Sequence, residues 1–457
     1  MPLYLLWTGG IILPMNYTYF VNLGSWFFIS FVVSLVIGSV FSNILGWLNT
    51  EKFDLKNRIS KIQGLCETAK KLFSTRKVNR AMKYKNTVEG FEDTVSTIHS
   101  GISTLTVMFG ILPFTVAMCS RILPDGTRTL WSWILASVLS MAVTTLISIP
   151  SDYYKDFTIE KNFGFNTKTR KTFFSDIAKA FAIGTVLTVG IQYLLDMALR
   201  TFGNLTFKNI FMLIFSIVVV SKILQWVFIN VIMPLFNDFS PLKDKKLQKK
   251  IENLCKKCNF NVSKIEVMNE SKRSKHSNAF ICGSLFRKKI VLFDTILKNM
   301  THDEIVSIIA HEIGHGKLHH LAIGNIQAIL NLVIYTVLSV FLMKIPAFYS
   351  AFGYSWVTQD NVTQNYVIGF SLTTTFIGAF SWVFTPLSNW ISRKMEYAAD
   401  RYAANHIDNR KDLENALLKL TSENMSDIAP HPAYEFANYS HPSILNRILA
   451  IRENEEE

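Results

Sequence analysis

The pattern of hydrophobic positions along the chain is dominated by long apolar runs that contain few or no charged residues. An apolar run of about 20 residues is long enough to cross the hydrocarbon core of a bilayer as an α-helix. Seven such runs predict seven membrane-spanning helices. The runs are Tyr19–Leu48, Ile102–Ile122, Leu130–Ile149, Ile177–Leu199, Ile210–Phe236, Leu321–Met343 and Asn365–Trp390.

Between the fifth and sixth runs, and after the last run, apolar residues instead recur at the short intervals typical of amphipathic helices and strands. Period-3.6 patterns predict an amphipathic helix at Leu242–Cys258 and a second helix at His302–His320. Short apolar segments predict strands at Lys264–Met268 and Ser284–Phe293, and the tail is mostly helical. The chain therefore divides into 1–236 with five spans, a folded segment at 237–320, two more spans at 321–390 and a helical tail at 391–457.

Composition supports a membrane protein with substantial soluble parts. Of the 457 residues, 49% are hydrophobic and 18% are charged, whereas soluble domains average about 25% charged residues. A purely soluble protein and a disordered chain are therefore disfavoured. Five cysteines are too few for a disulfide scaffold. Cys255 and Cys258 lack a second ligand pair, so we interpret them as two half-buried thiols on a helix rather than a zinc knuckle or a redox pair.

The distribution of basic residues predicts the orientation in the membrane. Forty of the 47 Lys and Arg residues fall in the segments 49–101, 150–176, 237–320 and 391–457, which alternate with poorly charged connections. Basic segments stay on the cytosolic side, so the amino terminus is predicted to be lumenal and the carboxy terminus cytosolic. The net charge of +13 then describes a cytosolic face beside anionic headgroups rather than a nucleic-acid-binding surface.

The sequence His311-Glu312-Ile313-Gly314-His315 is an H-E-x-x-H motif. On a helix the two histidines lie one turn apart on one face, where both imidazoles can reach the same ion. Glu312 lies about 100° round the helix, close enough to accept a proton from water at that ion. Zinc suits two imidazoles and an open site, and it lowers the pKa of bound water towards about 7.

A third ligand candidate strengthens this interpretation, because H-E-x-x-H alone also arises by chance on an exposed helix with solvated histidines. His319 and His320 are interpreted as examples of such surface histidines. Glu396 and Asp400 place two carboxylates one helical turn apart, directly after the last span. Glu396 could complete a two-His, one-Glu site, and Asp400 could accept the spare ring N–H of His311.

The position of the motif relative to the spans is informative. The helix that contains H-E-x-x-H runs almost directly into the sixth span, and Glu396 emerges almost directly from the seventh. Both ligand segments are therefore fixed at the cytosolic ends of membrane helices. The predicted metal lies at or inside the cytosolic leaflet, and its substrate is expected to be attached to the membrane or able to enter a cavity among the helices.

Several separated motifs together resemble the type I CaaX prenyl proteases, which are integral-membrane zinc metallopeptidases of the endoplasmic reticulum and inner nuclear envelope. The matching segments occur in the family's order along most of the chain. They are 160–166 (EKNFGFN), 234–242 (PLFNDFSPL), 274–280 (SKHSNAF), 290–295 (IVLFDT), 310–315 (AHEIGH), 396–400 (EYAAD) and 439–443 (YSHPS) with Arg447. Gly316 departs from the pattern, because the family usually has Trp there, at the mouth of the site.

This resemblance implies an α-helical membrane protein in which seven transmembrane helices enclose a chamber, with a cytosolic zinc-metallopeptidase core of helices and a small β-sheet. It also implies one zinc ion and a substrate that ends in an isoprenylated Cys-a-a-X sequence, from which the last three residues are removed. The implied roles are zinc ligands for His311, His315 and Glu396, general base for Glu312, substrate-backbone binding for Asn278, and contact with the scissile carbonyl and its oxyanion for His441 and Arg447.

Alternatives remain open at the level of sequence. The zinc motif also resembles the HtpX type of quality-control membrane protease, which usually has fewer spans, and a non-enzymatic scaffold could keep the fold. Asn278, His441 and Arg447 could be ordinary polar residues of a loop and a tail helix. Lys222, within the fifth span, either faces an aqueous chamber or extends to the interface. The strand segment Ile290–Phe293 either offers a free edge to an extended peptide or is fully paired in a small sheet.

Overall fold

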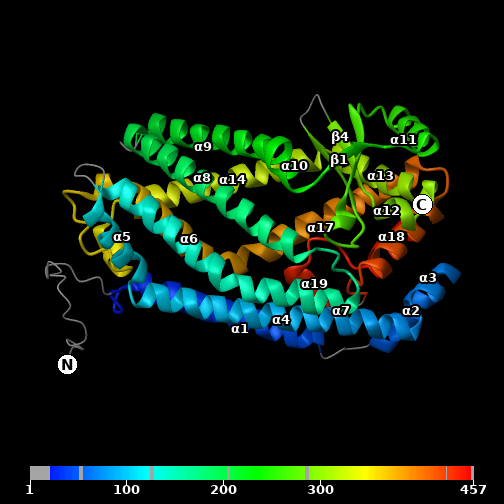
Figure 1. Cartoon of the computed structure of the whole chain (residues 1–457), viewed down its shortest axis with the longest axis horizontal. Coiled ribbons are helices and arrows are strands. Elements are labelled where there is room, and N and C mark those ends of the chain that lie inside the picture. The colour runs from blue at the N-terminus through cyan, green and yellow to red at the C-terminus, as the bar shows by residue number, and fades with distance from the viewer. Residues whose placement is uncertain are drawn as a thin grey trace.

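A computed structural model of the chain describes residues 21–50, 55–123, 128–202, 206–283, 288–428 and 430–453. Long helices run along the long axis of the molecule, and a small sheet with several short helices forms one end (Figure 1). The first residues of the first predicted span, Tyr19 and Phe20, lie outside the described residues.

Within the described residues, five helices are long and apolar enough to cross a membrane. They are Trp26–Asn49 in α1 (Trp26–Thr50), Leu130–Phe163 beginning in α6 (Arg128–Tyr154) and ending in α7 (Lys161–Phe163), α8 (Arg170–Phe202), Phe207–Phe236 beginning in α9 (Phe207–Val227) and ending in α10 (Met233–Phe236), and α14 (His320–Leu342). Each coincides with one of the predicted apolar runs.

Two further apolar segments are bent pairs of helices. The pair formed by α4 (Thr75–Met108) and α5 (Ile111–Ile122) bends by 59°. Gly110 lies at this break with φ +60°, a left-handed conformation that glycine adopts without steric cost. The pair Val362–Gly378, which includes α16 (Tyr366–Gly378), and α17 (Ser381–His406) bends by 70°. If each pair is one span, the described residues hold up to seven spans.

A four-stranded sheet lies at the end of the molecule that also holds α11 and α13 (Figure 1). Its order is β1 (Phe239–Pro241), β2 (Lys264–Met268), β4 (Lys288–Phe293) and β3 (Ala279–Gly283). β2 has the predicted bounds, and β4 is the described part of the second predicted strand. β2 pairs with β4 in parallel, whereas the β1–β2 and β3–β4 pairs are antiparallel. The free-edge hypothesis for Ile290–Phe293 is therefore wrong, because β4 is paired on both sides and β3 forms the edge.

Short helices complete this end of the molecule. They are α2 (Leu55–Leu65), α3 (Glu67–Leu72), α11 (Lys245–Lys257), α12 (Ile296–Asn299), α13 (His302–Lys317), α18 (Arg410–Glu423), α19 (Pro432–Asn438) and α20 (Ile444–Glu453), whereas α15 (Pro346–Ala351) lies between α14 and α16. The helix predicted at Leu242–Cys258 is α11, which begins after Asp244 because the Asp244 carboxylate accepts hydrogen bonds from the backbone N–H groups of Lys246 and Leu247.

Two separate clusters of buried apolar side chains hold the fold together. The soluble core lies among the sheet, α11, α13, α18 and α20, and the distal core lies among α1, α6, α15 and α16 towards the other end. Members of the soluble core include Ile251, Ile290, Ile309 and Leu413, and members of the distal core include Phe31, Trp133, Phe348 and Tyr354. Cys255 and Cys258 are free thiols, as expected, but the prediction that they are half-buried is wrong, because both are buried in the soluble core.

The membrane helices between these two cores are sparsely packed. Only 6% to 22% of the most apolar window of each of the five spans is buried within the chain. The helices thus expose apolar surface along most of their length, as expected where lipid replaces protein neighbours.

Candidate metal centre

The helix α13 presents the H-E-x-x-H motif and has a well-defined start. The Thr301 hydroxyl accepts a hydrogen bond from the Glu304 N–H, and the Glu304 carboxylate accepts one from the Thr301 N–H at 2.8 Å. This capping box satisfies backbone donors that a helix start otherwise leaves unpaired. After Lys317 the chain turns at His319, whose φ of +57° lets α14 begin at His320. The motif helix thus passes into a membrane helix, as the sequence predicts.

Gly314 brings α13 close to α17, the helix that carries Glu396 and Asp400. A Cβ atom at position 314 would lie 3.1 Å from the Ala399 carbonyl oxygen and 3.2 Å from its Cα. These are backbone atoms of α17 that cannot rotate away. The close approach allowed by glycine therefore sets Glu396 and Asp400 opposite the two histidines of the motif.

Three side chains from these helices converge on one point. The Nε2 atoms of His311 and His315 are 3.1 Å apart. The Glu396 carboxylate completes a triangle, with Oε2 3.4 Å from His311 Nε2 and Oε1 3.3 Å from His315 Nε2. Zinc–ligand bonds of about 2.0–2.1 Å place tetrahedral ligand atoms about 3.3 Å apart. The two histidine nitrogens and the Glu396 carboxylate, which turns one oxygen towards each of them, therefore lie at about the spacing of zinc ligands.

A second observation supports the fit to a metal ion. Glu396 is only 4% exposed, and its Oε2 atom is buried without a hydrogen-bond partner among the described residues. Leaving a buried carboxylate oxygen unpaired is costly, because the group loses its hydration and gains nothing in return. A cation among the three ligand atoms would satisfy it. His311, His315 and Glu396 could therefore hold a metal ion.

Outer hydrogen bonds orient both imidazoles. The His311 Nδ1 lies 2.9 Å from the Asp400 carboxylate, the position that the sequence predicts. The His315 Nδ1 lies 2.9 Å from the Nδ1 of His320 at the start of α14. The interpretation of His320 as a surface histidine is wrong, because its side chain is buried, whereas His319 is exposed. The turn at His319, which the sequence does not reveal, directs His320 back towards the motif.

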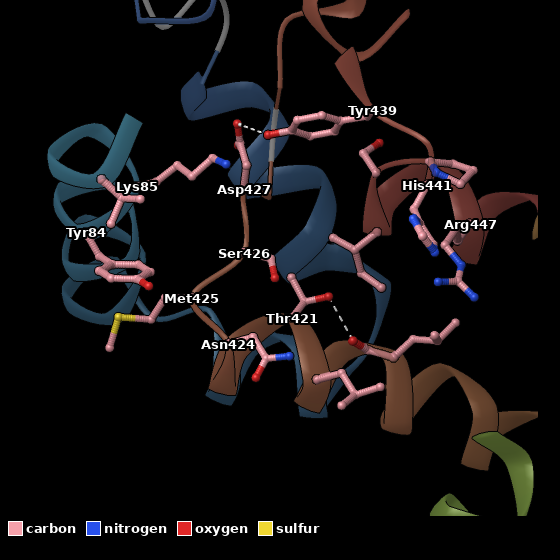
Figure 2. A pocket seen from close by; sticks show the side chains of 16 residues that line it. Tyr84, Lys85, Thr421, Asn424, Met425, Ser426, Asp427, Tyr439, His441 and Arg447 are labelled. Atoms are coloured by element: carbon pink, nitrogen blue, oxygen red, sulfur yellow. Dashed lines mark hydrogen bonds between the residues drawn. The ribbon is translucent and has the colours of Figure 1, made fainter. Parts of the chain in front are cut away.

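Arg447 and His441 border the same carboxylates. Arg447, on α20, binds Asp400 with two hydrogen bonds of 2.6 Å and 2.8 Å and lies 3.8 Å from Glu396. His441 Nε2 lies 3.5 Å from Glu396 Oε1 and is largely exposed. Figure 2 shows both side chains at one end of a pocket. They are therefore within reach of a group bound at the triangle, and their substrate-contact role stays a prediction.

Arg393, one turn before Glu396 on α17, is a residue that sequence analysis missed. Its buried guanidinium donates hydrogen bonds to the carbonyl oxygens of Glu435 and Tyr439. The Glu435 carboxylate in turn accepts a hydrogen bond from the Ser443 N–H at 2.9 Å. These bonds fix the loop that carries His441 onto the helix that carries Glu396. The sequence feature that points to Arg393 is its position one helical turn before Glu396.

The electrostatic surroundings are strongly coupled. Burial alone would lower the pKa of His311, but the hydrogen bond to Asp400 and the nearby Glu396 carboxylate raise it to about 9. Burial raises the pKa of the Glu312 carboxyl, and the neighbouring His311 and His315 partly offset this effect. The Asp400 carboxylate outweighs burial and raises the pKa of Arg447. The carboxylates thus supply negative charge that a bound cation would balance.

Asn278 lies outside this cluster, immediately before the edge strand β3. Its side chain is exposed, and its Oδ1 atom accepts a hydrogen bond from the adjacent Ala279 N–H. Among the described residues, no hydrogen bond or ion pair joins Asn278 to the three metal-ligand candidates. Its substrate-binding role stays a prediction.

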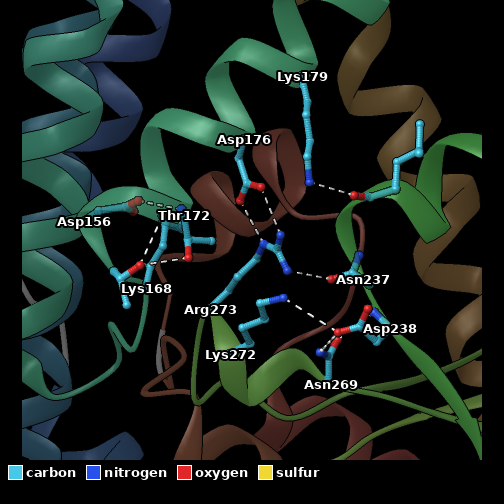
Figure 3. A network of polar contacts seen from close by, with 12 residues as sticks. Asp156, Lys168, Thr172, Asp176, Lys179, Asn237, Asp238, Asn269, Lys272 and Arg273 are labelled. Atoms are coloured by element: carbon cyan, nitrogen blue, oxygen red, sulfur yellow. Dashed lines mark hydrogen bonds and ion pairs between the residues drawn. The ribbon is translucent and has the colours of Figure 1, made fainter.

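Polar contacts attach the loop before β3 to the membrane helices. Arg273 forms a two-pronged ion pair with Asp176 of α8, with both contacts at 3.0 Å, and also reaches Asn237 (Figure 3). Lys272 contacts Asp238 in the same network. The loop that leads to Asn278 is therefore held by Asp176 of α8 and by Asn237 and Asp238, which directly follow α10.

Two of the sequence motifs meet in this loop. The His276 ring stacks on Phe165 with ring centres 4.2 Å apart, and its Nε2 lies 3.8 Å from the Glu160 carboxylate. A β-bridge also joins Asn166 and Ser274. The motif at 160–166 therefore supports the motif at 274–280 rather than contributing a separate site.

Gly316 has a structural explanation. A Cβ atom at this position would lie 2.6 Å from the ring of Phe260, a residue of the soluble core. Position 316 therefore lies against the soluble core, and its place at the mouth of the site stays a prediction. Here Phe260 occupies the space next to the helix that a larger side chain at 316 would need.

Comparisons with known proteins agree with this geometry. Residues 241–455 match peptidase family M48, and residues 56–238 match the description "CAAX prenyl protease N-terminal, five membrane helices". The chain is 32% identical to CAAX prenyl protease 1 of Saccharomyces cerevisiae over 330 residues, covering 68% of this chain and 70% of that protein. It is also 32% identical to the CAAX prenyl protease 1 homolog of Arabidopsis thaliana over 361 residues, covering 76% and 80%.

A solved structure shows the same fold. The crystal structure of S. mikatae Ste24p superimposes with a TM-score of 0.81 at 24% identity, covering 93% of this chain and 99% of that one. The resemblance drawn from the sequence motifs is thus confirmed. The chain belongs to the CAAX prenyl protease 1 family, the multi-pass membrane zinc metallopeptidases within peptidase family M48.

Proposed function

We propose that this enzyme removes the carboxy-terminal tripeptide from isoprenylated Cys-a-a-X proteins at the cytosolic face of the endoplasmic reticulum membrane, and also at the inner nuclear membrane. The observation that carries the proposal is the His311–His315–Glu396 triangle, built from helices that continue into, or emerge from, membrane spans. A catalytic centre at that depth suits a substrate whose lipid anchors it in the bilayer, and the relatives' names refer to that substrate class.

The proposed topology has seven spans that enclose a chamber, with a lumenal amino terminus and a cytosolic carboxy terminus. Counting each bent pair as one span gives an odd number, which separates the termini. Polar contacts between spans support a hydrated interior. Lys222 donates a hydrogen bond to Asn325 of α14 at 2.6 Å, and Gln192 of α8 donates one to Ser137 of α6 at 3.0 Å. Such groups avoid hydrocarbon, so they favour the chamber-facing alternative for Lys222.

The proposed active site holds one zinc ion through His311, His315 and Glu396. When bound, zinc polarises a carbonyl group and lowers the pKa of a coordinated water molecule, which generates a nucleophile near neutral pH. Asp400 and His320 keep the two imidazoles in the tautomers that present Nε2 to the ion. Glu312 projects from the same helix one residue after His311, and it is the proposed proton acceptor.

The proposed substrate contacts follow the arrangement around the triangle. A peptide that adds to the edge strand β3 would gain backbone hydrogen bonds and pass Asn278. Arg447 and His441 lie beside Glu396, where their N–H groups can donate to the oxygen of the scissile carbonyl as it becomes negatively charged. Asp400 holds the Arg447 guanidinium in place for that contact.

The proposal is tested with purified protein and two versions of one Cys-a-a-X peptide, farnesylated and unprenylated. We expect release of the terminal tripeptide from the farnesylated peptide, and much slower release from the unprenylated one. Addition and removal of a zinc chelator controls for a contaminating protease. Equal cleavage of both peptides, or cleavage at scattered sites in an unfolded membrane protein instead, would contradict the proposed function.

A further inference from the structure

A pocket of about 470 Å³ extends from Arg447 and His441 to the membrane helix α4. Figure 2 shows these two side chains on one side of the pocket and Tyr84 and Lys85 of α4 on the other. Its floor includes Asn424 and Ser426 in the loop after α18. Ligand pockets commonly have volumes of roughly 300–1,000 Å³, so this one can hold a short peptide segment.

The lining is chemically divided. Six apolar side chains contribute to it, and these suit aliphatic peptide side chains. They are Val88, Leu417, Leu420, Met425, Pro442 and Ile444. Lys85 and Arg447 contribute two basic side chains, whereas Asp427 is the single acidic residue among the lining residues. Asp427 accepts hydrogen bonds from Tyr439 and Asn49, both at 3.4 Å. Each cation already faces a carboxylate, Glu89 for Lys85 and Asp400 for Arg447, so a negatively charged ligand group would bind through N–H donors that these pairs leave free.

Lys85 is held in position at the far end of this pocket. Its ammonium group pairs with Glu89 at 3.0 Å and lies 5.5 Å from the centre of the Tyr439 ring. The Tyr434 hydroxyl donates a hydrogen bond to Glu89 at 3.1 Å, which fixes that carboxylate. The Lys85 side chain remains 28% exposed. An ammonium group has three N–H donors, so the pair with Glu89 leaves donors for a second anion.

The geometry of the edge strand sets the direction in which a peptide would enter. Antiparallel pairing is the more common arrangement and already joins β3 to β4. An antiparallel peptide on the free edge of β3 runs towards the start of the strand, so its carboxy-terminal residues approach Ser277. The Asn424 side chain, which lines the pocket, accepts a hydrogen bond from the Ser277 N–H at 3.0 Å and donates one to the Ser277 carbonyl oxygen at 3.1 Å. The peptide's carboxy-terminal end is thereby delivered to the pocket.

From these observations we infer that the pocket binds the three residues that follow the scissile bond, and that Lys85 recognises their free terminal carboxylate. This inference rests on the proposed function and adds a residue that determines specificity. Three extended residues span about 10 Å, so the terminal carboxylate lies well beyond Arg447 and His441 and needs a separate cation. Lys85 would then distinguish a true chain end from an internal peptide segment.

The test compares two farnesylated peptides that differ only in a terminal carboxylate or carboxamide. For the wild-type enzyme we expect kcat/KM for the acid to exceed that for the amide about tenfold, which is the effect of one charge-assisted contact. Lys85→Met is expected to remove this preference, and Lys85→Arg is expected to keep most of it. Asp427→Asn is expected to increase the preference, because it removes the negative charge from the lining.

Lys83→Met is the matched control, because Lys83 is exposed on the same helix and is not one of the lining residues. It is expected to keep the wild-type preference. Equal turnover of acid and amide by the wild type, or an unchanged preference in Lys85→Met, would overturn the role of Lys85 while leaving the proposed function intact. A wild-type enzyme that cleaves neither peptide would overturn the proposed function and this inference together.

Discussion

The two ends of the molecule are stabilised by different kinds of contact. Around the metal centre, buried carboxylates are paired with basic side chains: Glu304 with Lys419 at 2.7 Å, Glu414 with Arg452 at 2.6 Å, and Asp400 with Arg447. The distal core relies instead on aromatic rings in edge-to-face contact, such as Phe348 and Phe352 with centres 5.5 Å apart. Hydrogen-bonded ion pairs constrain direction and distance, whereas aromatic packing tolerates small shifts.

The two ends also differ in their buried polar atoms that lack a hydrogen-bond partner. In the distal core, the Trp133 indole N–H and the Tyr354 hydroxyl are buried without a partner among the described residues. At the metal centre, the corresponding unpaired atom is Oε2 of Glu396. The polar groups there are otherwise joined into one network. The comparison suggests that the site end is built to hold ligand atoms in place, and that the distal end is built to close the bundle.

The largest expected effect comes from removing a ligand. His315→Ala deletes one corner of the triangle and leaves only His311 and Glu396 of the three ligand candidates, so we expect loss of bound zinc and of all detectable peptidase activity. Elemental analysis of the purified variant measures the zinc. His302→Ala is the matched control, because His302 lies at the other end of the same helix, where its Nε2 is 2.9 Å from the Asp244 carboxylate, and the variant is expected to keep zinc. A full zinc content in His315→Ala would reject it as a ligand.

Removing the proposed base separates chemistry from metal binding. Glu312→Gln keeps the size of the side chain but cannot accept a proton, so we expect kcat to fall about 10²–10⁴-fold, as for other general bases. Zinc content is expected to stay at the wild-type level, because Glu312 is not part of the triangle. Single-turnover cleavage of the farnesylated peptide measures the rate. Wild-type turnover in this variant would exclude Glu312 as the base.

An intermediate effect is expected from the outer carboxylate. Asp400→Asn weakens the contact to His311 Nδ1 and leaves Arg447 without its charged partner, so zinc affinity is expected to fall about 10–100-fold. Competition with a chelator measures the affinity. Glu414→Gln is the control. It breaks the ion pair between Glu414 of α18 and Arg452, which lies on α20 like Arg447. We expect it to lower thermal stability without changing zinc affinity. Equal zinc affinities in the two variants would contradict the orienting role of Asp400.

Sequence reasoning located the spans and the ligand triangle because both have strong local signals. Apolar runs report membrane helices directly, and i, i+4 pairs such as His311 with His315 or Glu396 with Asp400 share a helix face by geometry. His320 was misread because its direction depends on one left-handed residue, His319. The free edge of β3 and the position of Lys85 beside the pocket depend on packing between distant segments. Hydrophobic periodicity in a single sequence does not reveal such packing.

The smallest expected effects come from two glycines, one at each end of the molecule. At Gly314 an added Cβ would meet the Ala399 backbone at 3.1 Å, and at Gly369 it would lie against the Tyr349 hydroxyl and 2.6 Å from Met343 Cβ. Overpacking of this kind costs about 1–3 kcal/mol. Both alanine variants are therefore expected to lower the melting temperature in detergent by several degrees, measured by unfolding of the purified protein.

The two variants are expected to differ in their effect on the metal. Gly314→Ala separates α13 from α17, so the histidines move relative to Glu396 and zinc affinity falls together with stability. Gly369→Ala disturbs only the aromatic packing of the distal core, and its zinc affinity is expected to match the wild type. If both variants lost zinc affinity equally, the distal core would also be setting the ligand geometry. If neither did, the α13–α17 spacing would not control the triangle, and the contrast between the two ends would fail.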